Sequence, residues 1–535
     1  MASMEDHDDH LSQERTPVTA APRRRLLLFA APIVAAVVVI SVLGRARSTD
    51  PPASSLDAST STVTDATPPS TSTSTSTTTA TTTTLYAGWV DPVSSGKPYP
   101  RSVVAGLITF RGNPTRSWYG TGPIPRSPSI LWSFPAGAGG MCALSDGGGE
   151  EGVQTWCGTG WNGQPSVWER NGKTWVAFGA YDDSVHFLDA ATGDRLLPDL
   201  KTGDLAKGTV TVDPDGYPLL YHGSRDNNLR VIALDRSDPT TLWKLNAYDV
   251  SPVLWNDDWD GSPLVLGDYL FEGGENSQIH IVKLNRGYDA DGKVTVRPEL
   301  VFHAPGWDQE LLNALGDHMV SIENSVNITG NTIWFANSGG LVQGWDISHL
   351  RDGVAPTRIF RFWTGDDTDA SIVSDADGFL YVASEWKRHT DRGHQIGQIM
   401  KLDPRKPDDP VVWSINDQGS GKFGVWGTPA LYQDMLYVPT NGGRLLGIDR
   451  ATGAIRWEKR LPGPTWQSPV PIDGVLIEGD CSGVLHAYDI HDTHVDPPEL
   501  WNVKLQGCIE STPAVWNGRI YVGARGGRFY AIGDH

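Results

Sequence analysis

The chain has 535 residues and is acidic, with 43 Lys and Arg against 63 Asp and Glu and a formal net charge of -20. This charge excludes a dedicated nucleic-acid binder, because phosphate backbones are bound through clustered basic side chains. Four cysteines are too few for a disulfide-rich scaffold, and the absence of a Cys-x-x-Cys-His sequence excludes covalently attached c-type haem.

The first 43 residues predict a cytoplasmic tail and a membrane anchor. Residues 1–25 are polar and end in three arginines, Arg23 to Arg25. The uncharged run from Leu26 to Leu43 would rise about 27 Å as a helix, close to the hydrocarbon thickness of a bilayer. The arginines before it place the N-terminus in the cytoplasm and the rest of the chain outside. The alternative is a cleaved signal peptide, with Gly44 to Ala46 resembling a cleavage site.

Residues 44–84 predict a disordered linker. Ser48 to Thr84 contains 24 Ser or Thr in 37 residues, with no aromatic residue and no Lys or Arg. Such a composition cannot bury enough apolar surface to offset the loss of chain entropy on folding. We expect a stalk, either bare or O-glycosylated.

Residues 85–535 predict a single all-β domain built from repeats. Short alternating strands are separated by Gly-containing turns, and the clearest unit runs from Gly427 to Gly463. A spacing of roughly 40 to 60 residues is typical of propeller blades, each a four-stranded antiparallel sheet. Eight copies begin near Gln164, Thr209, Ser262, Ser325, Ala370, Gly427, Ser468 and Ser511.

The two ends of this domain are predicted to close the ring. The last copy ends at His535 after its third strand, whereas Ile130 to Phe134 resembles the fourth strands of other copies. We therefore expect Ile130 to Phe134 to pair with Arg528 to Ile532. This pairing would remove an open sheet edge and complete an eight-bladed β-propeller.

The repeat resembles that of the pyrroloquinoline-quinone-like (PQQ-like) propellers. Asp189 to Gly193 and Asp449 to Trp457 carry the resemblance best, together with the segment from Phe110 to Pro125. The family includes quinoprotein dehydrogenases and non-catalytic scaffolds, so the resemblance implies the fold more strongly than a reaction. One Trp on each of several fourth strands resembles the family's docking tryptophans, and we expect packing between blades from Trp132, Trp243, Trp413, Trp457 and Trp501.

The topology of a propeller sorts its loops onto two faces. The turns between second and third strands lie on the same face as the links between blades, which we call the connection face. All four cysteines map to it, and chain proximity favours disulfides between Cys142 and Cys157 and between Cys481 and Cys508. Buried free thiols are the alternative.

The same face collects unusual aromatic and acidic residues, which are our candidate ligand-binding site. Tryptophans there could stack on a sugar or planar cofactor, and carboxylates could bind a cation such as Ca²⁺. The alternative is that the acids are solvated and the tryptophans fill gaps between blades. The candidates are Trp156, Trp161, Trp259, Asp260, Glu323, Asp369, Trp426, Trp466 and Glu510.

Two other segments carry weaker signals. Glu385 to His394 is a basic insertion in the second turn of the fifth copy, suited to gripping an anion or to solubilising a hairpin. His491 to His494 has residue types that bind metals, but it lies in an irregular loop and we expect a solvated surface there.

These patterns predict a binding or scaffold module outside the plasma membrane, with a monomeric ectodomain and an envelope protein or glycan as partner. A PQQ-dependent dehydrogenase with Ca²⁺ and a carbohydrate-binding protein are the alternatives. PQQ is disfavoured because the family's dehydrogenases carry adjacent cysteines, which this sequence lacks. We assign no catalytic residue and no metal ligand, and we expect no nucleic acid as partner.

Overall fold

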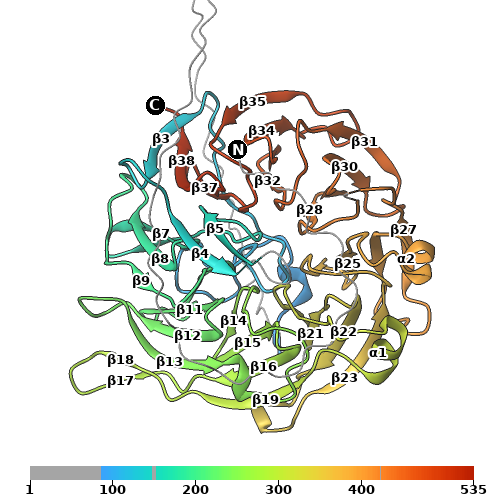
Figure 1. Cartoon of the computed structure of the whole chain (residues 1–535), viewed down its shortest axis with the longest axis horizontal. Helices are drawn as coiled ribbons and strands as arrows, with labels where there is room; N and C mark the ends of the chain where they lie inside the picture. The colour runs from blue at the N-terminus through green and yellow to red at the C-terminus, as the bar shows by residue number, and fades with distance from the viewer. Residues whose placement is uncertain (1–85, 147–151, 422) are drawn as a thin grey trace, which may run out of the picture. The chain divides into compact units, whose positions relative to one another are not determined.

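Eight antiparallel sheets follow one another around a central axis in chain order (Figure 1). The structure is a computed structural model that describes residues 86–146, 152–421 and 423–535. The predicted tail, anchor and linker lie outside these residues. Within the described ranges, no helix combines the length and apolar character needed to cross a membrane.

Each sheet contains a blade of four antiparallel strands, and two of the sheets carry a fifth strand from the central segment described below. The predicted eight-bladed, all-β architecture is therefore confirmed. Within each blade, the first strand lies nearest the axis and the fourth lies at the outer edge. Each predicted copy starts just before the first strand of a blade. From blade 1 to blade 8 the strands are β6 (Ser166–Arg170), β7 (Lys173–Ala180), β8 (Ser184–Asp189) and β9 (Leu200–Lys201); β10 (Thr211–Val212), β11 (Leu219–Ser224), β12 (Asn228–Ala233) and β13 (Thr240–Asn246); β14 (Leu264–Leu266), β15 (Tyr269–Gly274), β16 (Gln278–Lys283) and β19 (Glu299–Pro305); β20 (Asn327–Thr329), β21 (Thr332–Phe335), β22 (Leu341–Asp346) and β23 (Thr357–Trp363); β24 (Val373–Ser374), β25 (Leu380–Ala383), β26 (Ile399–Leu402) and β27 (Val411–Ile415); β28 (Ala430–Tyr432), β29 (Met435–Pro439), β30 (Arg444–Asp449) and β31 (Ile455–Arg460); β32 (Val470–Ile472), β33 (Val475–Gly479), β34 (Val484–Asp489) and β35 (Glu499–Lys504); and β36 (Ala514–Trp516), β37 (Arg519–Ala524), β38 (Arg528–Gly533) and β3 (Ser129–Phe134).

Shorter elements decorate the blades. A hairpin on the connection face precedes blade 1, a second lies between the third and fourth strands of blade 3, and two short helices lie in the link to blade 4 and in the second turn of blade 5. They are β4 (Cys142–Asp146) with β5 (Val153–Cys157), β17 (Gly287–Tyr288) with β18 (Val294–Thr295), α1 (Gln309–Leu315) and α2 (Asp391–Ile396).

The N-terminal strand closes the ring as predicted. β3 pairs antiparallel with β38, with Trp132 opposite Ala531 and Phe134 opposite Phe529. The Phe529 ring also stacks on Phe178 of blade 1, with centroids 3.9 Å apart. Blade 8 is therefore held together by the two ends of the domain.

Tryptophans on fourth strands pack against the next blade, which confirms the packing interpretation for Trp132 and Trp413. Each indole N–H donates to a backbone carbonyl of the following blade, 3.1 Å away in both cases. A Cβ at Gly193 or Gly453 would lie 2.8 Å from the ring of Trp132 or Trp413, and both glycines have positive φ. The Ala-Thr-Gly turn therefore needs glycine for its backbone conformation and for the close approach of the indole.

The segment before β3 fills the centre of the propeller, which the sequence did not predict (Figure 1). It adds β1 (Gly106–Leu107) to the inner edge of blade 1 and β2 (Gly120–Thr121) to that of blade 8. Between them, the guanidinium of Arg111 donates to the carbonyls of Pro469 and Pro429, each 2.8 Å away. Arg116 donates to Val326 and Ser262 at 2.8 and 3.1 Å. The two buried arginines thus join four blades at the axis.

Candidate functional site at the channel mouth

A belt of hydrogen bonds places one side chain from each blade at the connection-face end of the axis. The belt consists of one residue just before the first strand of each blade. Its backbone N–H donates to the side-chain oxygen of the equivalent residue in the next blade. Six such bonds, 2.8 to 3.1 Å long, lead from Gln164 through Thr209, Ser262, Ser325, Ser371 and Thr428 to Ser468. Because the belt is regular, the side chains two places before its members form a ring, which we call the channel mouth: Asn162, Lys207, Asp260, Glu323, Asp369, Trp426 and Trp466, with Glu510 at the equivalent place in the link to blade 8.

The ring surrounds a small cavity. Phe110 of the central segment lines the cavity on the inner side, and Trp161 reaches into it from the link before blade 1. The cavity volume is about 20 Å³, which is room for one or two water molecules. Of the nine predicted ligand-binding residues, five line it: Trp161, Asp260, Glu323, Asp369 and Trp426.

Three tryptophans form one side of the mouth. Trp161 and Trp426 meet edge to face with centroids 5.2 Å apart, and Trp466 meets Trp426 in the same way at 6.0 Å. All three are half-buried. This geometry is the one that aromatic quadrupoles favour, so the three rings support one another in place.

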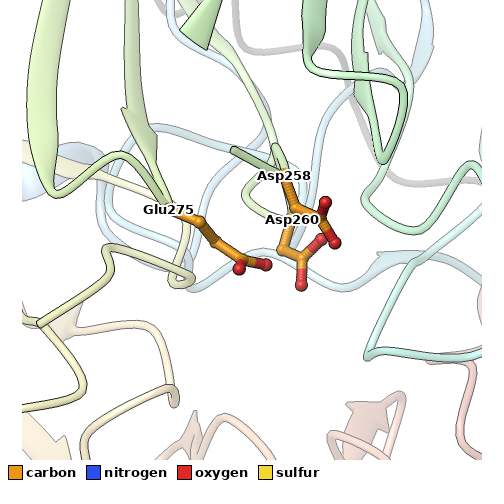
Figure 2. A group of neighbouring side chains, drawn as sticks. All are labelled: Asp258, Asp260 and Glu275. Carbon is orange, nitrogen blue, oxygen red and sulfur yellow. The ribbon is translucent and has the colours of Figure 1, made fainter. Parts of the chain in front are cut away.

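A buried ammonium lies between Trp161 and the acidic residues. Lys207 contacts Asp258 and Asp260 at 3.0 and 2.9 Å and Glu275 at 3.8 Å, and its Nζ lies 4.0 Å from the centroid of Trp161. Figure 2 shows the three carboxylates pointing into one space, two from the link before blade 3 and Glu275 from the turn after β15. The Lys207 ammonium therefore links the acids of the mouth to its tryptophans.

The charged side chains of this group shift one another's pKa values. Burial raises the pKa of Asp258 to about 7, although Lys207 opposes the shift. Burial and the neighbouring Asp260 and Asp258 raise the pKa of Glu275 well above its usual value. Burial alone would lower the pKa of Lys207, but Asp260 and Asp258 outweigh burial and raise it. Lys207 therefore stays charged while part of the acidic group is protonated near neutral pH.

A second acidic group adjoins the first. Asp367, Asp369 and Glu385 offer carboxylate oxygens within 4.8 Å of one another, and Lys387 lies 3.2 Å from Asp367. Burial raises the pKa of Asp369 well above its usual value and that of Glu385 to about 7, and nearby carboxylates add to both shifts. Burial together with Asp260 and Asp367 also raises the pKa of Glu323.

The basic insertion of blade 5 is part of this second group. Its hairpin is held by Asp366, whose carboxylate accepts the backbone N–H groups of Lys387, Arg388 and His389. Lys387 pairs with Asp367, and Arg388 pairs with Asp317 at 2.8 Å. The predicted anion grip is not supported for these two side chains, because each already faces a carboxylate.

Two buried polar atoms beside the cavity have no hydrogen-bond partner among the described residues. They are Nε1 of Trp161 and Oδ1 of Asp260, and the Asp260 side chain is 0% exposed. A buried polar atom without a partner costs free energy, so such atoms mark a place where a bound group would be stabilising.

Four predicted residues do not line the cavity, and one of them, Trp466, belongs to the ring and contacts Trp426. Trp259 is fully buried between Gly223 and His280, so it belongs to the core. Trp156 lies on β5 and is buried against blade 1, edge to face with Tyr181. Glu510 belongs to the ring but is paired with Arg525 at 3.0 Å. Contacts that form only in the folded domain engage these side chains, and a single sequence does not show such contacts.

The nine predicted ligand-binding residues did not include Lys207, Lys387 or Phe110. Lys207 has a signal in the sequence, because it precedes Thr209 with the same spacing that separates Asp260 from Ser262 and Trp426 from Thr428. Aligning the eight copies on this Ser or Thr would have included Lys207 in the ring. Phe110 has no such signal, because it comes from outside the repeats.

Both predicted disulfides are present. Cys142 joins Cys157 across the β4–β5 hairpin, and Cys481 in the second turn of blade 7 joins Cys508 in the link to blade 8. The bonds confirm that these turns and links share one face. They also cross-link two loops near the mouth, and this lowers the conformational entropy that such loops lose when they bind a ligand.

Comparison with known proteins gives one family match. Residues 395–496 match the family model described as outer membrane protein assembly factor BamB. No curated protein sequence matches the chain.

Solved structures share the fold at low sequence identity. The quinohemoprotein alcohol dehydrogenase of Comamonas testosteroni has a TM-score of 0.54 and 13% identity, and that of Pseudomonas putida has 0.53 and 11%; each alignment covers 80% of both chains. BamB of Moraxella catarrhalis has a TM-score of 0.38 and 16% identity, covering 77% of this chain and 99% of its own. At such identities the likeness establishes the architecture alone.

Proposed function

Because the chain is a PQQ-like β-propeller protein, we propose that it is a binding module of the cell envelope, with the channel mouth as its ligand site. The observation that carries this proposal is the convergence at the axis. Five predicted residues from the links before blades 1, 3, 4, 5 and 6 line one cavity, in which two buried polar atoms lack a partner. Binding sites are expected where rigid loops on a stable scaffold meet.

The proposed location outside the plasma membrane rests on the N-terminal sequence. An anchor at residues 26–43 followed by the Ser/Thr-rich linker would present the propeller at a distance from the bilayer. The two disulfides are consistent with an oxidising compartment.

The residues at the mouth do not fit PQQ. A cavity of about 20 Å³ has no room for a three-ring cofactor, and the rings of Trp161 and Trp426, which line it, are in contact with each other edge to face. The four cysteines are joined in two separate bonds, neither between adjacent residues. The acidic groups would suit Ca²⁺ in ligand type, but each already contacts a lysine. We therefore propose neither cofactor.

The carbohydrate alternative has one observation in its favour. Trp255, in the link before blade 3, is 47% exposed and offers a ring to a sugar. It would bind at the rim of the connection face, whereas the tryptophans of the mouth are engaged with one another.

Site-specific photocrosslinking in cells that produce the full-length chain tests the proposed site. A benzophenone side chain would replace Leu144, which is 70% exposed on the connection face, or Val495, which is 48% exposed in a loop of the opposite face. We expect a discrete adduct from position 144 that Trp426→Ala abolishes, and none from position 495. An adduct only from position 495, or one indifferent to Trp426→Ala, would overturn the proposal.

A further inference from the structure

We infer that the channel mouth recognises a protonated primary amine at the end of an unbranched chain, namely a lysine side chain of a partner protein. This inference rests on the proposed function and names the chemistry of its ligand. Three features carry it: the division of the mouth into acids and aromatic rings, the size of the cavity, and a lysine of the chain itself that is bound in the same way.

The mouth is divided into two arcs. Asp260, Glu323 and Asp369 come from consecutive blades 3, 4 and 5, and Trp426 and Trp466 come from blades 6 and 7. Carboxylates neutralise an ammonium and accept its three N–H donors, while the faces of indole rings attract a cation through their quadrupole. An anion or a neutral planar ligand would use only one of the two arcs.

The charge on the acidic arc is incompletely balanced. Among the described residues, no ion pair involves Glu323 or Asp369, although Lys387 contacts the neighbouring Asp367. The Glu323 carboxylate accepts only neutral hydroxyls, from Ser321 at 2.7 Å and Ser338 at 3.2 Å. Within the part of the chain that the structure describes, the buried Oδ1 of Asp260 has no hydrogen-bond partner. A cation entering the cavity would meet all three carboxylates.

Lys207 shows how the site handles an alkylammonium. Its Nζ contacts Asp260 at 2.9 Å and lies 4.0 Å from the centroid of Trp161. Asp260 and Trp161 both line the cavity as well. An incoming ammonium would therefore meet the same combination of carboxylate and indole.

The cavity selects for a slender group. A volume of about 20 Å³ admits an ammonium and little else, since one water molecule already needs about 10 to 15 Å³ by the same measure. A trimethylated ammonium is larger, and the amine of an amino sugar is joined directly to a bulky ring. A lysine side chain instead has four methylenes that would extend past the half-buried tryptophans to the surface.

Calorimetry on the full-length protein in detergent tests this inference with four probes. They are Nα-acetyl-lysine amide, its Nε-trimethylated counterpart, glucosamine and CaCl₂. We expect saturable binding of the lysine amide in the millimolar range, and at least tenfold weaker binding of the trimethylated form and of glucosamine. Binding of CaCl₂ or glucosamine without binding of the lysine amide would overturn the inference.

A double variant tests the acids. Glu323→Gln with Asp369→Asn should weaken binding of the lysine amide at least tenfold, whereas Glu310→Gln, an exposed acid in the link before blade 4, should leave it unchanged. Unchanged thermal unfolding of both variants would show that the fold is intact. Equal affinity of the double variant and the wild type would overturn the inference.

The two experiments together distinguish the inference from the proposed function. If the lysine amide fails to bind while Trp426→Ala still abolishes the crosslink from position 144, only the ligand class is wrong. If the lysine amide binds while the crosslink is unaffected by Trp426→Ala, the proposed function is wrong.

Discussion

Trp161 and Trp426 meet edge to face with ring centroids 5.2 Å apart, although their links lead into blades 1 and 6. Trp161 reaches this position because the long link before blade 1 runs over the connection face and turns inwards, where Trp161 has a φ of 54°. The contact joins distant parts of the ring above the central segment. It makes the mouth a property of the closed propeller and of no single blade.

Trp426→Ala should weaken ligand binding by about 2 kcal/mol, because a few partly buried aromatic anchors supply most of the energy of an interface. The cost to folding should be small, since Trp426 lies at the mouth and outside the blade cores. Titration of the ligand and thermal unfolding of the same variant measure the two effects. A loss of stability as large as the loss of binding would indicate a structural role.

Binding of an amine should strengthen as the pH rises from about 5 to 8. Burial raises the pKa of Asp258 and Glu385 to about 7 and shifts the pKa of Asp369 upwards, so these acids carry protons that a bound cation would displace. The other charges facing them are Asp260, Asp367, Glu275 and Glu323 and the cations Lys207, Lys387 and Arg225. Proton release during calorimetry in buffers of different ionisation enthalpy checks the sign. Affinity that rises on acidification would contradict this prediction.

Arg111→Met should lower the free energy of unfolding by about 4 kcal/mol. The substitution leaves the buried carbonyls of Pro429 and Pro469 without their donors, and each such group costs about 1 to 3 kcal/mol. Arg405→Met is the matched control, because Arg405 is 60% exposed, pairs with Asp403 and lies over the ring of Phe379; it should cost less than about 1 kcal/mol. Denaturant unfolding compares the two. Equal costs would show that the central segment does not hold the blades.

Removal of residues 1–140 should cause aggregation, because it takes away β3 and leaves β38 as an open edge. Removal of residues 1–85 retains β3 and the central segment and serves as the control. Size-exclusion chromatography distinguishes the two. A monomeric 141–535 chain with unchanged thermal stability would contradict the role of β3 in closure.

Deletion of residues 1–47, with export driven by an unrelated signal, should release the propeller from membranes. No other uncharged run of predominantly apolar residues in the sequence approaches the length of Leu26 to Leu43. Fractionation after a high-salt wash measures this. Continued sedimentation with membranes would place an attachment site elsewhere in the chain.

The sequence alone determined the number of blades, the closure by Ile130 to Phe134 and both disulfides. These features depend on periods and on short-range pairing, and a repeat encodes them locally. Alternation places side chains in or out of the sheet, and Gly193 or Gly453 marks a turn on which the Trp of the preceding blade packs. The same regularity placed Asp260, Glu323, Asp369 and Trp426 on one face, because links between blades must share an end of the axis.

Only the tertiary structure decided which of these residues share a cavity. Trp259 and Glu323 look alike as candidates in the links, yet Trp259 is buried against the neighbouring Gly223 while Glu323 lines the mouth. The difference depends on the distances between blades, which follow from packing across the whole ring. The central segment is the clearest case. Arg111 and Arg116 are stable when buried because carbonyls from four blades converge on them, and that convergence exists only once the propeller has closed.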